Sequence, residues 1–106
     1  MPAEIGVQEL SDRLRAESKP TVLDVREHDE VEVAPFKGAL HIPMGEVPQR
    51  IEELDADSEI VVLCHHGIRS LRVAHYLEQA GFQNITNLSG GIDAWSLHID
   101  SSVARY

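Results

Sequence analysis

The sequence predicts a single α/β domain in which a central, mainly parallel sheet of five strands is flanked by helices on both faces. Segments with strand composition alternate along the chain with segments of helical spacing, which is the pattern of βαβ crossovers. The run EIVVLC at 59–64 lacks polar alternation, as expected of a strand buried on both faces of a parallel sheet. A chain of 106 residues is about one domain, and it is long enough to form a core without disulfides or structural metals. We therefore expect one domain across residues 1–106.

Five short segments are expected to form the strands. They are rich in β-branched or other apolar residues, and proline, glycine or polar residues bound them. In chain order, they lie near residues 5–7 and at residues 21–25, 39–43, 59–64 and 84–88. Residues 26–38 are polar and contain Pro35 and Gly38, so we expect a loop there with room for one helical turn.

Helices are expected where apolar or small residues recur every three or four positions. The inward faces are Val7, Leu10 and Leu14 for the first helix, Val47, Ile51 and Leu54 for the second, and Ser70, Val73, Ala74 and Leu77 for the third. The third helix is expected to begin near Arg69, and Gly81 is placed to cap its C-terminal end. Residues 92–97 predict a short final helix.

The segment CHHGIRS at 64–70 joins a buried strand to a helix, and it carries the one cysteine of the chain, Cys64. In parallel α/β sheets, ligands bind beyond the carboxyl ends of the strands, which is where Cys64 falls. Backbone N–H groups at a helix start have no intrahelical partner and can converge on one point, and Gly67 permits the positive φ that such a curl needs. The helix N-terminus adds partial positive charge, so the pKa of the Cys64 thiol should be depressed. Arg69 is placed to close this ring with a fixed positive charge.

Two other interpretations of Cys64 compete with a reactive thiol. A single cysteine at the end of an apolar strand is commonly a small buried hydrophobe, but a core cysteine has no need of a curled polar loop. The adjacent His65 and His66 suggest metal ligands, but three consecutive residues rarely converge on one ion, and no CxxC or HxxxH partner is present. We therefore expect no metal and no cofactor, and we expect both imidazoles to point outward from the loop.

The charge of the chain excludes some partners. Its 18 acidic and 9 basic residues give a net charge of −9 and no basic patch, which disfavours binding to nucleic acid or to an anionic membrane surface. Such a surface would suit a basic protein partner, or it serves only solubility. The N-terminal residues lack the pattern of a signal peptide, and the longest apolar run, 60–64, is far below the roughly 18 residues of a membrane span. These features predict a cytoplasmic protein.

Four motifs, in order, resemble the single-domain rhodaneses, a family of sulfurtransferases. The stretch LDVRE at 23–27 is similar to the one after the family's second strand, and GALHIP at 38–43 resembles its Gly-x-x-x-Ile-Pro element. The loop CHHGIRS matches the active-site pattern Cys-x-x-Gly-x-Arg-Ser/Thr, and LSGGIDAW at 88–95 resembles the closing Gly-Gly-x-x-x-Trp segment. The similarity covers roughly residues 4–97 and leaves 98–106 as a tail without a clear period, which we expect to run over the surface.

The resemblance implies a rhodanese-like fold in which Cys64 is the catalytic nucleophile. Cys64 would take a sulfane sulfur from thiosulfate or a persulfide donor, become a persulfide, and pass the sulfur to cyanide, a thiol or a protein acceptor. The same match implies that the loop cradles the substrate through main-chain amides and that Asp24 and Arg26 brace the loop. The substrate-binding residues so implied are His65, His66, Gly67, Ile68, Arg69 and Ser70. Two histidines stand where some members place cationic side chains suited to thiosulfate, so a protein persulfide or another small donor is an equal candidate.

Other activities of similar folds fit less well. The related phosphatases and some arsenate reductases carry five residues between cysteine and arginine, whereas residues 65–68 form a shorter ring that suits a single sulfur atom better. Arsenate reduction through an internal thiol relay would also need a second cysteine. The alternative that stays open is a persulfide carrier or binding module in a sulfur-trafficking pathway, with little turnover of its own. With one cysteine, sulfur must leave to an outside acceptor.

Overall fold

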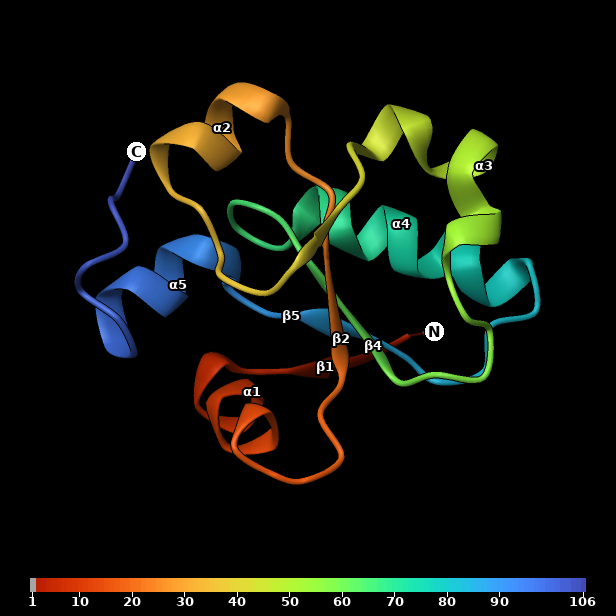
Figure 1. Ribbon diagram of the computed structural model, residues 1–106, viewed down its shortest axis with the longest axis horizontal. Coiled ribbons are helices and arrows are strands. Elements are labelled where there is room, and N and C mark those ends of the chain that lie inside the picture. Colours follow the sequence, from red (N-terminus) through yellow and green to blue (C-terminus); the bar gives the residue numbers. More distant parts are fainter. Residues whose placement is uncertain (1) are drawn as a thin grey trace.

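The strands form one parallel sheet in the order β1-β5-β4-β2-β3, with helices on both faces (Figure 1). The computed structural model describes residues 2–106, so Met1 of the expected domain lies outside the described residues. The strands are β1 (Ala3–Ile5), β2 (Thr21–Asp24), β3 (Leu40–His41), β4 (Ile60–Leu63) and β5 (Ile85–Leu88). The predicted fold class and five-stranded parallel sheet are confirmed.

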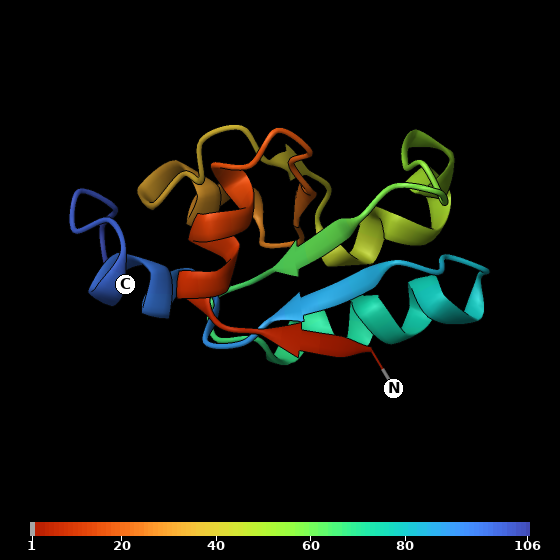
Figure 2. The same ribbon diagram turned by 90° about the horizontal axis from the view of Figure 1, so that it is seen from below.

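The helices follow the strands as crossovers. They are α1 (Val7–Leu14), α2 (His28–Val33), α3 (Val47–Arg50), α4 (Ile68–Gln79) and α5 (Gly91–His98), with short 3-10 helices η1 (Met44–Glu46) and η2 (Ile51–Glu53) beside α3. The expected start of the third predicted helix is confirmed to within one residue, because α4 begins at Ile68. Figure 2 shows α1 and α4 on opposite sides of the sheet.

Some predicted boundaries were wrong, for local reasons. The first strand ends at Ile5 rather than Val7, because Val7 already lies in α1 with its side chain buried. Within the expected loop 26–38, six residues form α2. The side chains of Glu27 and Glu30 each accept a hydrogen bond from the other's backbone N–H, and such a capping box stabilises a helix start. The second predicted helix continues only to Arg50 as an α-helix before tightening into η2.

The core consists of one apolar cluster on each face of the sheet. Side chains of α3 and α4, including Val47, Val73 and Leu77, pack on one face. Side chains of α1 and α5, including Leu10 and Ile92, pack on the other. All four residues of β4 are buried, which agrees with its uninterrupted apolar sequence. The described residues contain no helix long and apolar enough to cross a membrane.

Candidate active site

Cys64 directly follows β4 at the carboxyl end of the sheet, and the next residues curl around its sulfur. Gly67 adopts φ +107°, in the left-handed region, and its backbone N–H donates a hydrogen bond to Cys64 Sγ over 3.1 Å. Cys64 is only 1% exposed, and its side chain also packs within the apolar cluster on the α3–α4 face of the sheet. Cys64 is therefore buried, as a structural cysteine would be, but hydrogen-bond donors surround its sulfur.

These donors decide the ionisation of the thiol. Burial by itself raises the pKa of Cys64, but hydrogen bonds from the Ser70 hydroxyl and from the backbone N–H groups of Ser70, Gly67 and His66 outweigh it. The net result is a pKa below the ordinary cysteine value. The Ser70 hydroxyl has one proton and also lies within hydrogen-bond distance of Asn87 Oδ1, so the backbone amides are the constant donors. The arrangement favours a thiolate.

Asn87 in β5 holds the loop from the sheet side, and we did not identify it from the sequence. Its side-chain oxygen accepts the Ser70 hydroxyl, while its amide nitrogen donates to the Gly67 carbonyl oxygen over 3.1 Å. The same nitrogen donates to Glu4 Oε1 in β1 at 3.1 Å. A buried asparagine within the predicted strand 84–88 was the available signal, because a buried amide requires partners.

The first turn of α5 holds the loop from the other side. The backbone N–H groups of Ile92 and Asp93 donate to the carbonyl oxygens of Cys64 and His65 over 2.9 and 3.1 Å. Gly91 makes this approach possible, because a Cβ atom there would lie 2.4 Å from each of those two oxygens. Gly91 thus has a structural role at the loop, and the Trp95 indole packs against Phe36 with ring centroids 4.9 Å apart.

The guanidinium of Arg69 is directed to a carboxylate rather than left free beside the sulfur. Its Nη1 and Nη2 each donate to one oxygen of Glu30 in α2 over 2.7 Å. This bidentate contact lowers the pKa of Glu30 from 4.5 to about 2 and raises that of Arg69. The sequence predicted a fixed positive charge at Arg69, and the structure adds that this charge is paired with a carboxylate. Glu30 is a site residue that the sequence analysis missed.

Asp24 and Arg26 form a buried ion pair one strand away from Cys64. Arg26 Nε and Nη2 donate to the two carboxylate oxygens of Asp24 over 2.9 and 2.7 Å, and both side chains are almost fully buried. Arg26 also donates to the carbonyl oxygen of Ala34, at 2.8 Å, and to the Tyr106 hydroxyl, at 3.2 Å. The pair therefore connects β2 to the end of α2 and to the C-terminal residues. Among the described residues, its side-chain hydrogen bonds go to these segments and not directly to residues 64–70.

The two histidines lie differently from one another. The side chain of His66 is 60% exposed, as expected, but the ring of His65 is sandwiched between His66 and Tyr106, with centroids 3.9 and 4.0 Å away. Burial, followed by the neighbouring His66, lowers the pKa of His65, which keeps this imidazole neutral near pH 7. The tail 98–106 therefore does more than run over the surface, because Tyr106 packs against His65 in the 64–70 loop.

Asp93 brings a carboxylate close to the two imidazoles. One ligand atom from each of His65, His66 and Asp93 lies within 4.8 Å of the others, and His65 Nε2 is a buried atom without a hydrogen-bond partner among the described residues. However, Arg105 already occupies both oxygens of Asp93, at 3.0 and 3.3 Å. A cation at this position would have to share the Asp93 carboxylate with that guanidinium.

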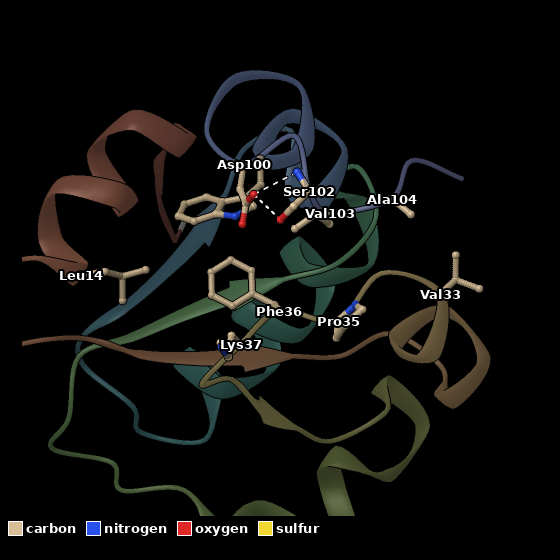
Figure 3. A pocket seen from close by; sticks show the side chains of 10 residues that line it. Leu14, Val33, Pro35, Phe36, Lys37, Asp100, Ser102, Val103 and Ala104 are labelled. Atoms are coloured by element: carbon tan, nitrogen blue, oxygen red, sulfur yellow. Dashed lines mark hydrogen bonds between the residues drawn. The ribbon is translucent and has the colours of Figure 1, made fainter.

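A cavity of about 590 Å³ lies apart from the sulfur loop, between the end of α1, the segment after α2 and the C-terminal tail (Figure 3). Leu14, Phe36 and Val103 are among its lining residues, and the described loop residues 64–70 are not. The sulfur of Cys64 instead lies buried among backbone amides, with Ile68 69% exposed nearby in the chain.

Comparison with known proteins gives a consistent result. Residues 6–98 match the family described as "Rhodanese-like domain". The chain is 39% identical over 92 residues to the "Putative sulfurtransferase YtwF" of Bacillus subtilis (strain 168), covering 87% of this chain and 88% of that protein. It is 36% identical over 93 residues to the "Putative sulfur carrier protein YrkF" of the same organism, covering 88% of this chain and half of that longer protein. The crystal structure of a "Rhodanese-like Domain Protein from Staphylococcus aureus" superposes with a TM-score of 0.86 at 27% identity, over 98% of both chains.

Proposed function

This chain belongs to the rhodanese-like sulfurtransferase family, and we propose that it carries the transferred sulfur on Cys64 as a cysteine persulfide. The observation that carries the proposal is the ring of backbone N–H groups around a buried sulfur, with Gly67 N–H 3.1 Å from Sγ. The donors that stabilise a thiolate also suit the anionic terminal sulfur of a persulfide.

Each half-reaction balances at sulfur. The Cys64 thiolate attacks the outer sulfur of the donor, a new S–S bond forms, and the bond between that sulfur and the rest of the donor breaks. Sulfite leaves if the donor is thiosulfate, and a thiolate leaves if the donor is a persulfide. In the second step, cyanide, a thiol or a protein thiolate attacks the terminal sulfur, and Cys64 departs as a thiolate.

The other loop residues orient this chemistry. The amides of His66, Gly67 and Ser70 stabilise the negative charge, and the first turn of α5 donates hydrogen bonds to the carbonyl groups of Cys64 and His65. Because the amides belong to a rigid loop anchored on both sides, little reorganisation is needed when the charge moves from one sulfur to the next.

The proposal is tested by intact-mass spectrometry after incubation with thiosulfate or with a persulfide donor such as glutathione persulfide. We expect a mass increase of one sulfur atom, removable by cyanide or dithiothreitol. Cys64→Ser should take up no sulfur and transfer none, while a control such as His75→Gln, on the outer face of α4, should behave as the wild type. Sulfur transfer by Cys64→Ser would remove the cysteine from the mechanism.

A second candidate function is sulfur carriage without turnover, and the likeness to a putative sulfur carrier protein favours it. In both functions Cys64 becomes a persulfide. They differ in the second step, because a carrier should release its sulfur to a protein acceptor and react slowly with cyanide. Single-turnover release from the isolated persulfide form distinguishes the two.

A further inference from the structure

The entrance to the Cys64 loop contains an arginine whose charge is already balanced. Arg69 follows directly after exposed Ile68, and each of its terminal nitrogens donates a hydrogen bond of 2.7 Å to the Glu30 carboxylate. The Cys64 thiolate lies close enough to Arg69 to contribute to the raised pKa of the guanidinium. The positive charge of Arg69 therefore acts on the sulfur in turn. A paired carboxylate removes much of this positive field, because opposite charges in contact act at a distance as a dipole.

Glu30 is held ionised and oriented by the surrounding residues. Its side chain accepts hydrogen bonds from the Tyr106 hydroxyl, at 3.0 Å, and from the backbone N–H of Glu27, at 2.9 Å, as well as from Arg69. Tyr106 in turn accepts a hydrogen bond from the buried Arg26. The Glu30 carboxylate therefore has a fixed position beside the loop. It is contributed by α2 and oriented by the hydrogen bond from Tyr106.

The other charged groups beside the loop do not restore a positive field. Asp93 is paired with Arg105, and the neighbouring His65 is neutral near pH 7. Around these groups, the exposed side chains of Ile68 and Tyr106 offer apolar surface. This combination suits a donor with an organic body and a small charge better than a compact dianion.

We propose that Glu30 is a specificity-determining residue, which masks Arg69 and thereby directs the site toward organic persulfides and away from thiosulfate. This inference rests on the proposed function and names its donor class. Thiosulfate carries two negative charges, whereas the reacting part of a thiol persulfide carries at most one. Removing the carboxylate while keeping its shape should therefore uncover the arginine and favour the dianion.

The test compares Glu30→Gln with wild type for two donors, thiosulfate and glutathione persulfide. A glutamine still accepts one hydrogen bond from Arg69 and one from Glu27, so helix α2 should persist. We expect kcat/KM for thiosulfate to rise roughly tenfold and kcat/KM for glutathione persulfide to change less than about twofold. The matched control is Glu32→Gln, which removes the same charge from an exposed position of the same helix.

A second readout needs no sulfur transfer. Iodoacetate and iodoacetamide alkylate the same thiolate, so the ratio of their rate constants cancels any change in the pKa of Cys64 and reports the charge beside the sulfur. Glu30→Gln should raise the iodoacetate-to-iodoacetamide ratio by roughly threefold or more, and Glu32→Gln should leave it nearly unchanged. The double variant Glu30→Gln/Arg69→Gln removes both charges and should keep the wild-type donor preference.

The remaining outcomes contradict either the role of Glu30 or the proposed function. Equal changes for both donors, an unchanged alkylation ratio, or the same effect from Glu32→Gln would overturn the role of Glu30. A double variant that loses thiosulfate use selectively would show that Arg69 acts as a free cation, and would also overturn it. If wild-type Cys64 takes up sulfur from neither donor, the proposed function fails, while the alkylation ratio still decides whether Glu30 masks Arg69.

Discussion

A cysteine as buried as Cys64 would ordinarily keep its proton. The loop after β4 counteracts this effect with hydrogen bonds to the sulfur. Burial raises the pKa of Cys64, and hydrogen bonds from the Ser70 hydroxyl and from the backbone N–H groups of three following residues together lower it by more. The result depends on these hydrogen-bond donors rather than on a nearby cation, because Arg69 is paired with Glu30. The loop thus stabilises negative charge on sulfur without a strong field that reaches into solvent.

The ionisation of Cys64 can be measured directly. Because its pKa is lowered, the thiolate fraction at neutral pH should exceed that of a free cysteine, whose pKa is about 8.5. The rate of alkylation by iodoacetamide should therefore reach its half-maximal value clearly below that pH. Cys64→Ser supplies the blank, because the chain has no other cysteine. A rate that rises only around pH 8.5 would contradict an activated thiol.

The buried pair Asp24–Arg26 gives a second prediction at this scale. Asp24→Asn keeps the shape of the side chain but leaves the Arg26 guanidinium buried without its carboxylate. We expect the free energy of unfolding to fall by about 3 kcal/mol, as for other broken buried ion pairs, measured by urea denaturation.

A matched substitution separates burial from charge. Glu46→Gln removes one partner of the exposed contact with Arg50 and should barely move the midpoint of unfolding. Equal losses in the two variants would mean that burial of the Asp24–Arg26 pair has no special weight.

Among the secondary-structure elements, β4, α4 and α5 meet at the loop that contains Cys64. The helix α4 supplies free N–H groups at its start, and the first turn of α5 binds the carbonyl oxygens of Cys64 and His65. The strand β5 contributes Asn87, which holds Gly67. Two glycines, Gly67 and Gly91, make the close approach possible. Four elements, β4, β5, α4 and α5, therefore hold the loop in place.

Gly91→Ala tests this convergence. The residue has φ +57°, and a Cβ atom would lie 2.4 Å from two backbone oxygens, so the start of α5 must move away from the loop. We expect a loss of about 3 kcal/mol in unfolding free energy together with a higher pKa of the Cys64 thiol. Gly45→Ala is the control, because a Cβ atom at Gly45 meets no atom within 4 Å. A Gly91→Ala variant with wild-type stability and wild-type alkylation would contradict the proposed contact.

At the scale of the whole molecule, one continuous sheet carries two separate apolar clusters, and β4 contributes to both. Val62 and Cys64 pack on the α3–α4 side, whereas Val61 and Leu63 pack on the α1–α5 side. The strand lies between β5 and β2, and it leads directly into the sulfur loop. Cys64 is thus attached to a strand that is buried on both faces of the sheet.

Native-state hydrogen exchange should reveal this hierarchy. Amides in β4 are expected to exchange only through global unfolding, while amides in β1 and β3, which are short strands at the two edges, exchange through smaller openings. The measurement is exchange followed by NMR across a range of denaturant concentrations. Protection of β4 that is no greater than that of the edge strands would contradict a stable platform beneath Cys64.

The sequence alone determined the alternation of elements, the parallel sheet, the position of Cys64 at a strand end and the curl at Gly67. These features follow from local patterns, namely apolar runs, helical spacing and the conformational freedom of glycine, which act over a few neighbouring residues. The short helix α2 was underestimated because its stability comes from a capping box rather than from an apolar face.

Which charges and rings meet at the site depends on long-range packing. Glu30, Asn87, Asp93 and Tyr106 come from segments distant in sequence from the 64–70 loop, and none carries a local signal of its partner. Their contacts arise because the crossovers bring α2, β5, α5 and the C-terminal residues together near the carboxyl ends of the strands. Sequence spacing does not indicate contacts between residues so far apart in the chain. For this reason, the position of Cys64 at the start of a curled loop could be predicted from the sequence, while the pairing of Arg69 with Glu30, and with it the charge beside the sulfur, could not.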